Sequence, residues 1–223
     1  MPTLHVGGPD HEHPTPEQMD EWRRWMSPPD NEFPAGVGLT VLLGRTDDAA
    51  VGITRIEAFT TGFRFTLAVR LRQALPGLGP GGLSMLVGSH GPRVEIPLEE
   101  RLLLGIEYSD GRRASTLRDQ MPAPGAMADR PRLVLAQHGG SAGEHSVDHT
   151  YWVAPLPPEG PVTFVLAWPA FGMPESGTVL DGAAIRAAAD RSQILWPPQP
   201  AAERREPPPP PRPSSGWFAE PPA

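Results

Sequence analysis

The sequence predicts a mostly β fold, an antiparallel two-sheet β-sandwich with a short N-terminal helix and a C-terminal helix. Several strand-like runs alternate apolar and polar residues, as strands with one buried face do. Clusters of Gly, Pro, Asp and Thr separate these runs as turns would. No regular alternation of strands with helices suggests a parallel sheet. An immunoglobulin-like sandwich is the expected type, although the chain has no cysteine for a Cys–Trp–Cys signature.

The 223 residues divide into three parts by composition. Residues 1–34 are polar, acidic and interrupted by prolines. Residues 35–196 carry nearly all of the strand-like alternation and form the predicted sandwich domain. Residues 197–223 are rich in proline and have too few apolar side chains to offset the entropy of ordering, so a disordered tail is predicted.

The N-terminal part contains one predicted helix, residues 16–26. Pro16 stands where the first turn of a helix tolerates proline, and Pro28 follows the helix end. Its apolar face carries two tryptophans, Trp22 and Trp25. Two interpretations follow: the face packs on the chain's own β domain, or it docks into a groove of a partner. Trp22 and Trp25 are therefore candidate partner-binding residues.

The first strands of the sandwich follow from alternation. Residues 37–43 alternate and lead into a turn at 45–48, and a change of phase near Thr54 predicts a β-bulge in the next strand. Residues 63–71 form the cleanest amphipathic strand, and residues 162–168 form another. The side chains predicted to lie inside are those of Phe63, Phe65, Leu67, Val69, Val162, Phe164, Leu166 and Trp168.

Weaker signals place the later elements. The Asp-Gly pair in Ser109-Asp-Gly111 predicts a hairpin between two strands. A weak strand is expected at 83–87, and a further strand at 133–137 precedes a glycine loop over 138–143. Residues 151–153 pair with the strand at 162–168, and Val179 and Leu180 add an edge strand. A C-terminal helix over 182–195 starts after Asp181 as its N-cap and stops at Pro197.

Several of these segments together resemble a group of uncharacterised actinobacterial proteins. The residues that carry the resemblance are 46–71, the Tyr108–Arg113 turn, the glycine loop before Asp148, and the Tyr151-Trp-Val-Ala-Pro-Leu-Pro-Pro158 run with Trp168-Pro169. The pattern W-V-x-P-L-P-P-x-G-P … W-P is specific and covers roughly residues 35–196. The resemblance implies one domain and no particular activity, so it supplies no catalytic residues.

Composition excludes several kinds of chemistry. Without cysteine the chain has no disulfides, thiolate nucleophile or thiolate metal site. All 19 basic residues are arginine, so a Schiff-base lysine is excluded as well. The net charge of -7 argues against nonspecific binding of nucleic acid. No stretch is typical of a signal peptide or a membrane span, and the expected location is the cytoplasm.

Gly139-Gly-Ser-Ala-Gly143 matches the G-x-S-x-G pattern of serine hydrolases. In those enzymes the serine lies on a sharp turn between a strand and a helix. Here the residues after the motif lead into a strand, so we interpret the segment as a flexible loop and predict no catalytic residue.

A group of metal-ligand residue types lies in the same region: His138, His145, Asp148 and His149. His145 and His149 are four residues apart, a spacing that would place both on one face and suit a metal if the segment were helical. The glycines and the following strand argue against a helix, so a solvated loop with a partly buried His149 is preferred. We therefore expect no metal and no cofactor, and these four residues remain the metal alternative.

Two further sets of residues are candidate partner contacts. Arg64, Arg70 and Arg72 share the outward face of one strand and could bind an anion or an acidic partner, the alternative being a solvated face. Trp217 and Phe218 stand in the polar tail, where we expect them to dock on a partner or on another copy of the chain.

Two functions remain. The preferred one is a noncatalytic β-sandwich binding or interaction module, which docks a protein partner or a second copy through exposed tails or helices. The alternative is an enzyme or a metal- or ligand-binding domain that uses the Gly/His-rich segment 138–149. An enzyme is the less expected of the two, because no nucleophile, base and acid converge in the sequence.

Overall fold

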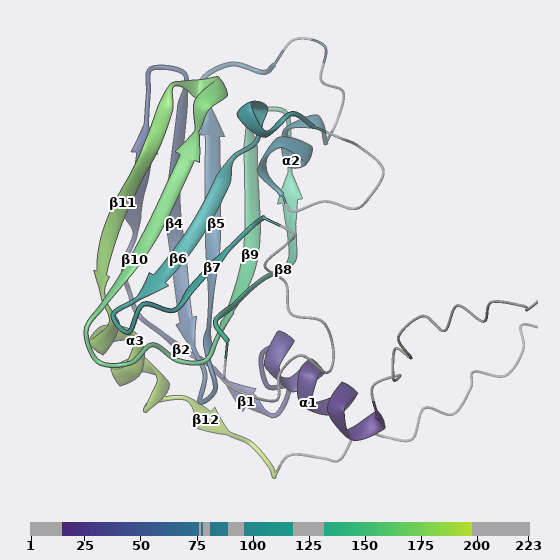
Figure 1. The fold of residues 1–223 in the computed structure, drawn as a ribbon, viewed down its shortest axis with the longest axis vertical. Coiled ribbons are helices and arrows are strands. Elements are labelled where there is room, and N and C mark those ends of the chain that lie inside the picture. Colours follow the sequence, from purple (N-terminus) through teal and green to yellow (C-terminus); the bar gives the residue numbers. More distant parts are fainter. Residues whose placement is uncertain (1–14, 76, 78–80, 89–95, 118–131, 198–223) are drawn as a thin grey trace, which may run out of the picture.

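The computed structural model describes residues 15–75, 77, 81–88, 96–117 and 132–197, and most of its strands form two antiparallel sheets that pack face to face (Figure 1). The first sheet has the order β2-β4-β5-β9-β8, with β3 also paired to β4. Its strands are β2 (Ala35–Gly36), β3 (Val41–Arg45), β4 (Ala49–Ala58), β5 (Phe63–Leu71), β8 (Val134–Ala142) and β9 (Ser146–Ala154).

The second sheet has the order β11-β10-β6-β7. Its strands are β6 (Leu103–Tyr108), β7 (Arg113–Ser115), β10 (Pro161–Trp168) and β11 (Met173–Asp181). The predicted mostly β, antiparallel architecture is confirmed.

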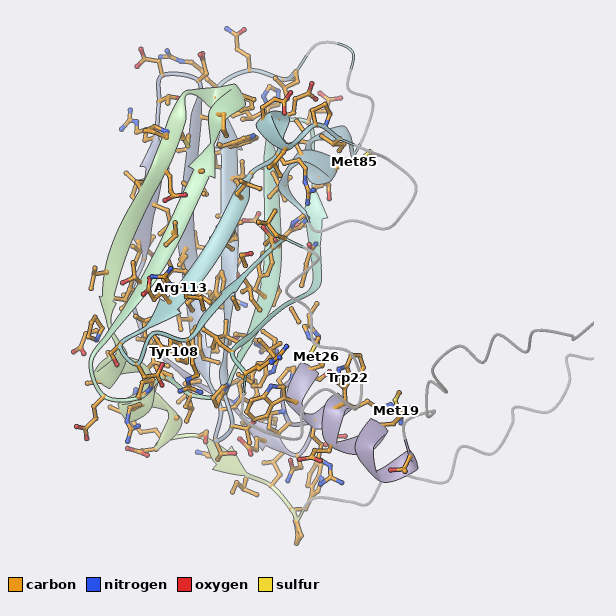
Figure 2. The ribbon with its side chains drawn as sticks, in the orientation of Figure 1. Met19, Trp22, Met26, Met85, Tyr108 and Arg113 are labelled. Carbon is orange, nitrogen blue, oxygen red and sulfur yellow. The ribbon has the colours of Figure 1, made fainter. Side chains whose placement is uncertain are left out.

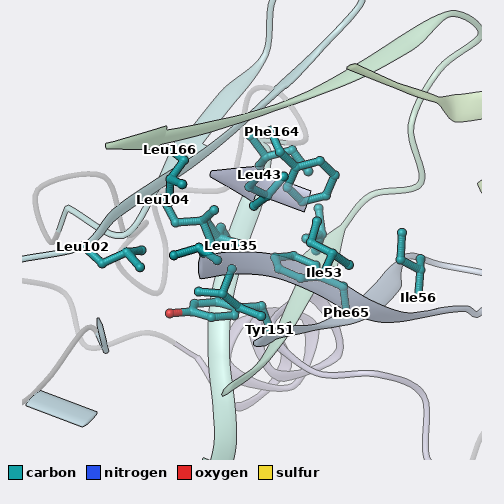
Figure 3. Close-up of a cluster of buried hydrophobic side chains, with 14 of the residues drawn as sticks. Leu43, Ile53, Ile56, Phe65, Leu102, Leu104, Leu135, Tyr151, Phe164 and Leu166 are labelled. Atoms are coloured by element: carbon teal, nitrogen blue, oxygen red, sulfur yellow. The ribbon is translucent and has the colours of Figure 1, made fainter. Parts of the chain in front are cut away.

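The core lies between the two sheets. All eight side chains predicted to lie inside from β5 and β10 are buried. Phe65 stands at the centre (Figure 3): its ring stacks on Tyr151 of β9 at 5.4 Å and meets Phe164 of β10 edge-on at 5.1 Å. Because Phe164 belongs to the second sheet, this contact joins the two layers.

The chain passes twice from the first sheet to the second. After β5 it runs through helix α2 (Gly82–Val87) and the 3₁₀ turn η1 (Leu98–Glu100) into β6, and β9 leads directly to β10. Within the sheets β5 pairs with β9, and β6 pairs with β10. A 3₁₀ turn, η3 (Pro169–Phe171), connects β10 to β11.

Helix α1 (Pro16–Met26) has the predicted bounds and lies against the first sheet near β8 and β9 (Figure 1). Helix α3 (Gly182–Ala189) starts where predicted, and the Asp181 carboxylate accepts a hydrogen bond from the Ala183 N–H at 2.9 Å. The predicted helix end at 195 is wrong. The helix stops at Ala189, and β12 (Gln193–Ile194) pairs with β1 (Glu32–Phe33).

Three local predictions are also wrong. Residues 151–153 do not pair with the strand at 162–168, because β9 pairs with β5 and β8 in the first sheet, and β10 pairs with β6 and β11 in the second. Residues 83–87 belong to helix α2 rather than a strand, since a short apolar run fits either element and the glycines before it allow the turn into a helix. Residues 138–142 are not a loop, because they complete strand β8 and pair with β9. The bulge near Thr54 and the hairpin at Ser109–Gly111 are confirmed by a register shift in β4 and by the β6–β7 pairing.

None of the helices in the described part of the chain combines the length and the apolar character that crossing a membrane requires.

Candidate functional site

The outer face of the first sheet, beside α1, carries a set of polar side chains in register. Residues that pair across the strands lie in one row of the sheet and point to the same face. One row consists of Arg55, Thr66, Thr150 and Gly139. The next row consists of Glu57, Arg64, Trp152 and Ala136. These residues alternate with buried core residues, so their side chains lie on the face opposite the sandwich core.

Two adjoining hollows open on this face. The first has a volume of about 280 Å³ and is lined by Pro28, Arg64, His138, Gly139, Gly140, Thr150 and Trp152. The second has a volume of about 240 Å³ and is lined by Arg55, Glu57, Arg64, Phe65, Thr66 and Thr150. Both include Arg64 and Thr150, so the two hollows adjoin across these side chains, and we name the pair of hollows the outer trough.

Helix α1 ends at the edge of the outer trough because two side chains of the sheet hold its last turn. The indole N–H of Trp152 donates to the Trp25 carbonyl at 2.9 Å. The His138 ring lies 2.6 Å from the Met26 carbonyl, and because a carbonyl only accepts, Nε2 of His138 carries the hydrogen and donates. These bonds satisfy carbonyl groups that the end of a helix leaves without an intrahelical partner.

The apolar face of α1 is covered by the same sheet. Trp22 and Met26 point from the helix toward the strands (Figure 2), where Met26 is buried with Val134 and Ala136 of β8. Trp25 packs beside Trp152 and Phe59. Of the two interpretations of this helix, the structure shows the one in which its tryptophans pack on the chain's own β domain.

Two glycines, Gly140 and Gly62, allow neighbouring strands and side chains to pack closely around the outer trough. Gly140 has φ +155°, and a Cβ at this position would lie 2.6 Å from the His149 ring, so a side chain would disturb the β8–β9 pairing. At Gly62, a Cβ would lie 2.7 Å from the Trp152 ring. Both glycines thus support the part of the sheet that holds α1.

The charges of the outer trough are unevenly paired. Nε of Arg64 donates to the Glu57 carboxylate at 2.6 Å, and its guanidinium lies 5.3 Å from the centre of the Phe59 ring. This pairing uses one nitrogen and leaves the two terminal nitrogens for other acceptors. Arg55 is exposed and makes no ion pair with any described residue. Among the charged residues that line the outer trough, two are therefore arginines and one is a glutamate.

The three predicted arginines do not form one cluster. Arg70 binds both carboxylate oxygens of Asp148, at 2.9 and 3.0 Å, so its charge is neutralised within the chain. Arg72 lies beyond the end of β5, where its backbone N–H donates to the Asp48 carbonyl. Only Arg64 lies in the outer trough.

The predicted metal-ligand candidates also lie apart. His138 lies on the outer face at α1, and His145 is exposed in the turn between β8 and β9. His149 points the other way, into the core, with Nε2 3.0 Å from the Ser84 hydroxyl of α2. Asp148 is occupied by Arg70. Across the described ranges, no three His, Cys, Asp or Glu side chains lie close enough together to hold a metal ion.

Ser141 of the G-x-S-x-G match lies within β8 and pairs with Asp148 of β9. No helix follows it, so the local geometry differs from the strained turn that exposes a nucleophilic serine. Trp217 and Phe218, the candidate contacts of the tail, lie outside the described residues.

The polar trough residues Arg55, Glu57, Thr66 and Thr150 were not among the sequence candidates. Thr66 and Thr150 occupy outward positions between buried residues of β5 and β9, a signal that the alternation contained. Arg55 follows the bulge in β4, where the alternation of inward and outward residues shifts by one position. The sequence pattern before the bulge therefore does not show that Arg55 points outward.

The groups that line the outer trough offer mainly hydrogen-bond donors. Its carboxylate, Glu57, is already bound to Arg64, and its imidazole, His138, donates to the Met26 carbonyl. The hydroxyls of Thr66 and Thr150 and the two guanidinium groups are hydrogen-bond donors. No known protein family, curated protein or solved structure matches the chain.

Proposed function

We propose that the protein is a noncatalytic β-sandwich binding module that holds its ligand in the outer trough. The observation that carries this proposal is that two adjoining hollows on one face of the sheet share Arg64 and Thr150. A concave site with a few convergent polar groups is the usual form of a ligand site. The sheet beneath it is built on the buried core, so the donors are held on a rigid surface.

The segment 138–149 contributes to this proposal in part. His138, Gly139 and Gly140 line the outer trough, which supports a role of this segment in ligand binding. Its remaining histidines, His145 and His149, lie elsewhere, so a metal or catalytic role gains no support from their positions. A binding function therefore accounts for more of the geometry than an enzymatic one.

We also propose that the sandwich is of the immunoglobulin type. In that fold one sheet has the strand order A-B-E-D and the other contains C, F and G, extended by C′ in variable domains. The orders β4-β5-β9-β8 and β11-β10-β6-β7 support the same arrangement, with β5 as B, β6 as C, β9 as E and β10 as F. The two crossings between the sheets then correspond to the B–C and E–F connections.

The binding proposal is tested by screening a library of neutral and charged small fragments against the ¹⁵N-labelled protein by NMR. We expect amide shifts to cluster at Gly139, Gly140 and Thr150. Thr150→Phe should fill the trough and abolish these shifts. Thr163→Phe, the same change on the outer face of the second sheet, is the matched control and should leave them unchanged. Shifts that cluster elsewhere, or that survive Thr150→Phe, contradict the proposal.

A second candidate function, self-association, has its own observation. The short sheet β1–β12 presents Phe33 and Ile194, which are 59% and 62% exposed, next to Trp196, which is 51% exposed. In the register Ile194 pairs with Glu32 and Phe33 pairs with Gln193, so Phe33 and Ile194 lie on opposite faces of this strip of two strands. Exposed apolar side chains on the strip favour burial against a like surface, which a second copy of the chain provides across a two-fold axis. A second copy of the chain is therefore the proposed occupant.

Sedimentation of the purified chain tests this candidate. We expect a concentration-dependent dimer that the double variant Phe33→Ser/Trp196→Ser abolishes. Val179→Ser removes an equally exposed apolar side chain on β11 and should leave the dimer intact. A monomer at every concentration would exclude self-association through the strip.

A further inference from the structure

We infer that the ligand of the outer trough carries an oxyanion, a carboxylate or a phosphate group, which binds between Arg55 and Arg64. This inference rests on the proposed binding function and adds the chemical class of the ligand. Its basis is the local balance of charge, the register of the two arginines, and the hydroxyl groups between them.

The local charge is opposite to that of the whole chain. The net charge is -7, yet the outer trough brings two guanidinium groups against the single carboxylate of Glu57. Arg55, like Arg45 and Arg72, has no ion-pair partner among the described residues, but unlike them it lines the trough beside Arg64. An acidic protein thus keeps an uncompensated cation beside a hollow, where an anion would be attracted.

Register brings the two arginines together. Arg55 of β4 pairs with Thr66, and Arg64 lies two residues before Thr66 on β5. The arginines are therefore diagonal neighbours on one face, a separation that long side chains can bridge. Both line the same hollow, so their guanidinium groups can converge on one group bound above the sheet.

The floor between the arginines suits an oxyanion. Thr66 and Thr150 pair directly across β5 and β9, and both side chains are partly exposed toward the trough. Their hydroxyls add two neutral donors to the charged donors of the arginines. A planar guanidinium group binds two oxygens of a carboxylate or phosphate group through two parallel N–H···O bonds. This geometry favours an oxyanion over other anions as the ligand.

The same features set the size and strength of the interaction. Two arginines against one carboxylate favour a small acid with one or two negative charges rather than a polyanion. The Arg64 side chain is 37% exposed, so solvent and salt screen its charge. Binding should therefore weaken as the salt concentration rises.

The experiment follows amide shifts of the full chain during titration with inorganic phosphate and, separately, with succinate. Saturable shifts at Gly139, Thr150 and Thr66 are expected with at least one of them, and the tighter of the two identifies the source of the oxyanion. Arg55→Gln should raise Kd about tenfold or more without changing the melting temperature, because Arg55 has no described partner to lose. Arg64→Gln should weaken binding similarly.

Arg113→Gln is the matched control. Arg113 also pairs with a glutamate, Glu107 at 2.8 Å, but it lies on the second sheet, so this variant changes the net charge equally and should bind as the wild type does. Equal affinity in Arg55→Gln, Arg64→Gln and Arg113→Gln, or the absence of saturable shifts with both anions, overturns the inference. If a neutral probe such as maltose shifts the trough amides while neither anion does, the site stands and only its ligand class is wrong. If none of the three shifts these amides and the fragment screen is also negative, the proposed function fails as well.

Discussion

The indole of Trp152 and the backbone of Trp25 are joined by a hydrogen bond of 2.9 Å, although the two residues stand 127 positions apart in the chain. Trp152 is fully buried in β9, and Trp25 lies in the last turn of α1. The helix is thus fixed to the sheet through a buried indole on the outer face, which packs with Phe59 and Trp25 and lines the outer trough.

Trp152→Phe should release this attachment. We expect a loss of about 2 kcal/mol or more in the free energy of unfolding, from the lost hydrogen bond and the cavity left by the smaller ring. Hydrogen exchange of the α1 amides should accelerate. Trp168→Phe is the control, since Trp168 is equally buried and donates to the Glu100 carbonyl at 3.0 Å. It should destabilise the protein without a selective effect on α1.

Phe65→Ala should destabilise the domain by about 3–5 kcal/mol, because it removes the ring that joins β5, β9 and β10. Urea unfolding measures the change. Thr66→Ala, one residue further on the outer face, should stay within about 0.5 kcal/mol of the wild type. An unchanged midpoint for Phe65→Ala would contradict the placement of Phe65 in the core.

Removal of the hydroxyl group should lower the free energy of unfolding at Tyr108 but not at Tyr151. The Tyr108 hydroxyl donates to the Pro155 carbonyl at 2.6 Å, and Tyr108→Phe should cost about 1–2 kcal/mol because that carbonyl loses its donor. The Tyr151 hydroxyl is buried without a hydrogen-bond partner among the described residues. Tyr151→Phe should therefore be neutral or stabilising. A larger loss for Tyr151→Phe than for Tyr108→Phe in urea unfolding would refute this contrast.

Stability should fall above about pH 10. Burial raises the pKa of Tyr108 and of Tyr151 well above the ordinary value of 10.0. In the unfolded chain both hydroxyls ionise near that value. Above it the unfolded state binds fewer protons than the folded state, so stability is intact below pH 10 and decreases as the pH rises further.

The expected slope is about 1.4 kcal/mol per pH unit for each tyrosine. The chain contains two tyrosines, no cysteine and no lysine, so no other side-chain type titrates near pH 10. Tyr151→Phe should therefore halve the slope in urea unfolding between pH 10 and the onset of arginine titration. A slope that Tyr151→Phe leaves unchanged would show that Tyr151 ionises alike in both states.

Deletion of residues 200–223 should leave the melting temperature within about 1–2 °C, because the described domain is complete in its core without them. We expect the deletion to remove an interaction with a protein partner or with a second copy, since Trp217 and Phe218 lie in this segment. Unfolding of the truncated chain, or persistence of every interaction, would contradict the prediction.

Alternation predicted the centre of the fold well. In β5 and β10 every second side chain lies in the core. Because side chains alternate between the two faces of a strand, the position of an apolar residue in the sequence shows that it faces the core. Segments that form a strand only by pairing with another part of the chain could not be predicted from their own sequence. Residues 139–142 have the composition of a loop but form a strand, because the amides of β9 beside them require partners. β12 likewise exists only because β1 pairs with it.

The outer trough was predictable only in fragments. Arg64, His138 and Gly139 were each noted in the sequence, but in separate contexts, as a charged strand face and as a glycine loop. Their convergence depends on the register of four strands, with Thr150 placed between Thr66 and Gly139. A single sequence shows which residues of each strand point outward. It does not show the register, which sets the residues of one strand opposite those of the next.

The pairing of β1 with β12 has a consequence for the order of events during synthesis. The Asn31 side chain donates to the Trp196 carbonyl at 2.7 Å across 165 positions, and Glu32 and Phe33 pair only with residues 193 and 194. The first strand to leave the ribosome must therefore wait for almost the whole sandwich to emerge before it finds its partner. Closure of this sheet should be the last step of folding, and a nascent chain stalled before residue 193 would carry β1 without its only described partner strand.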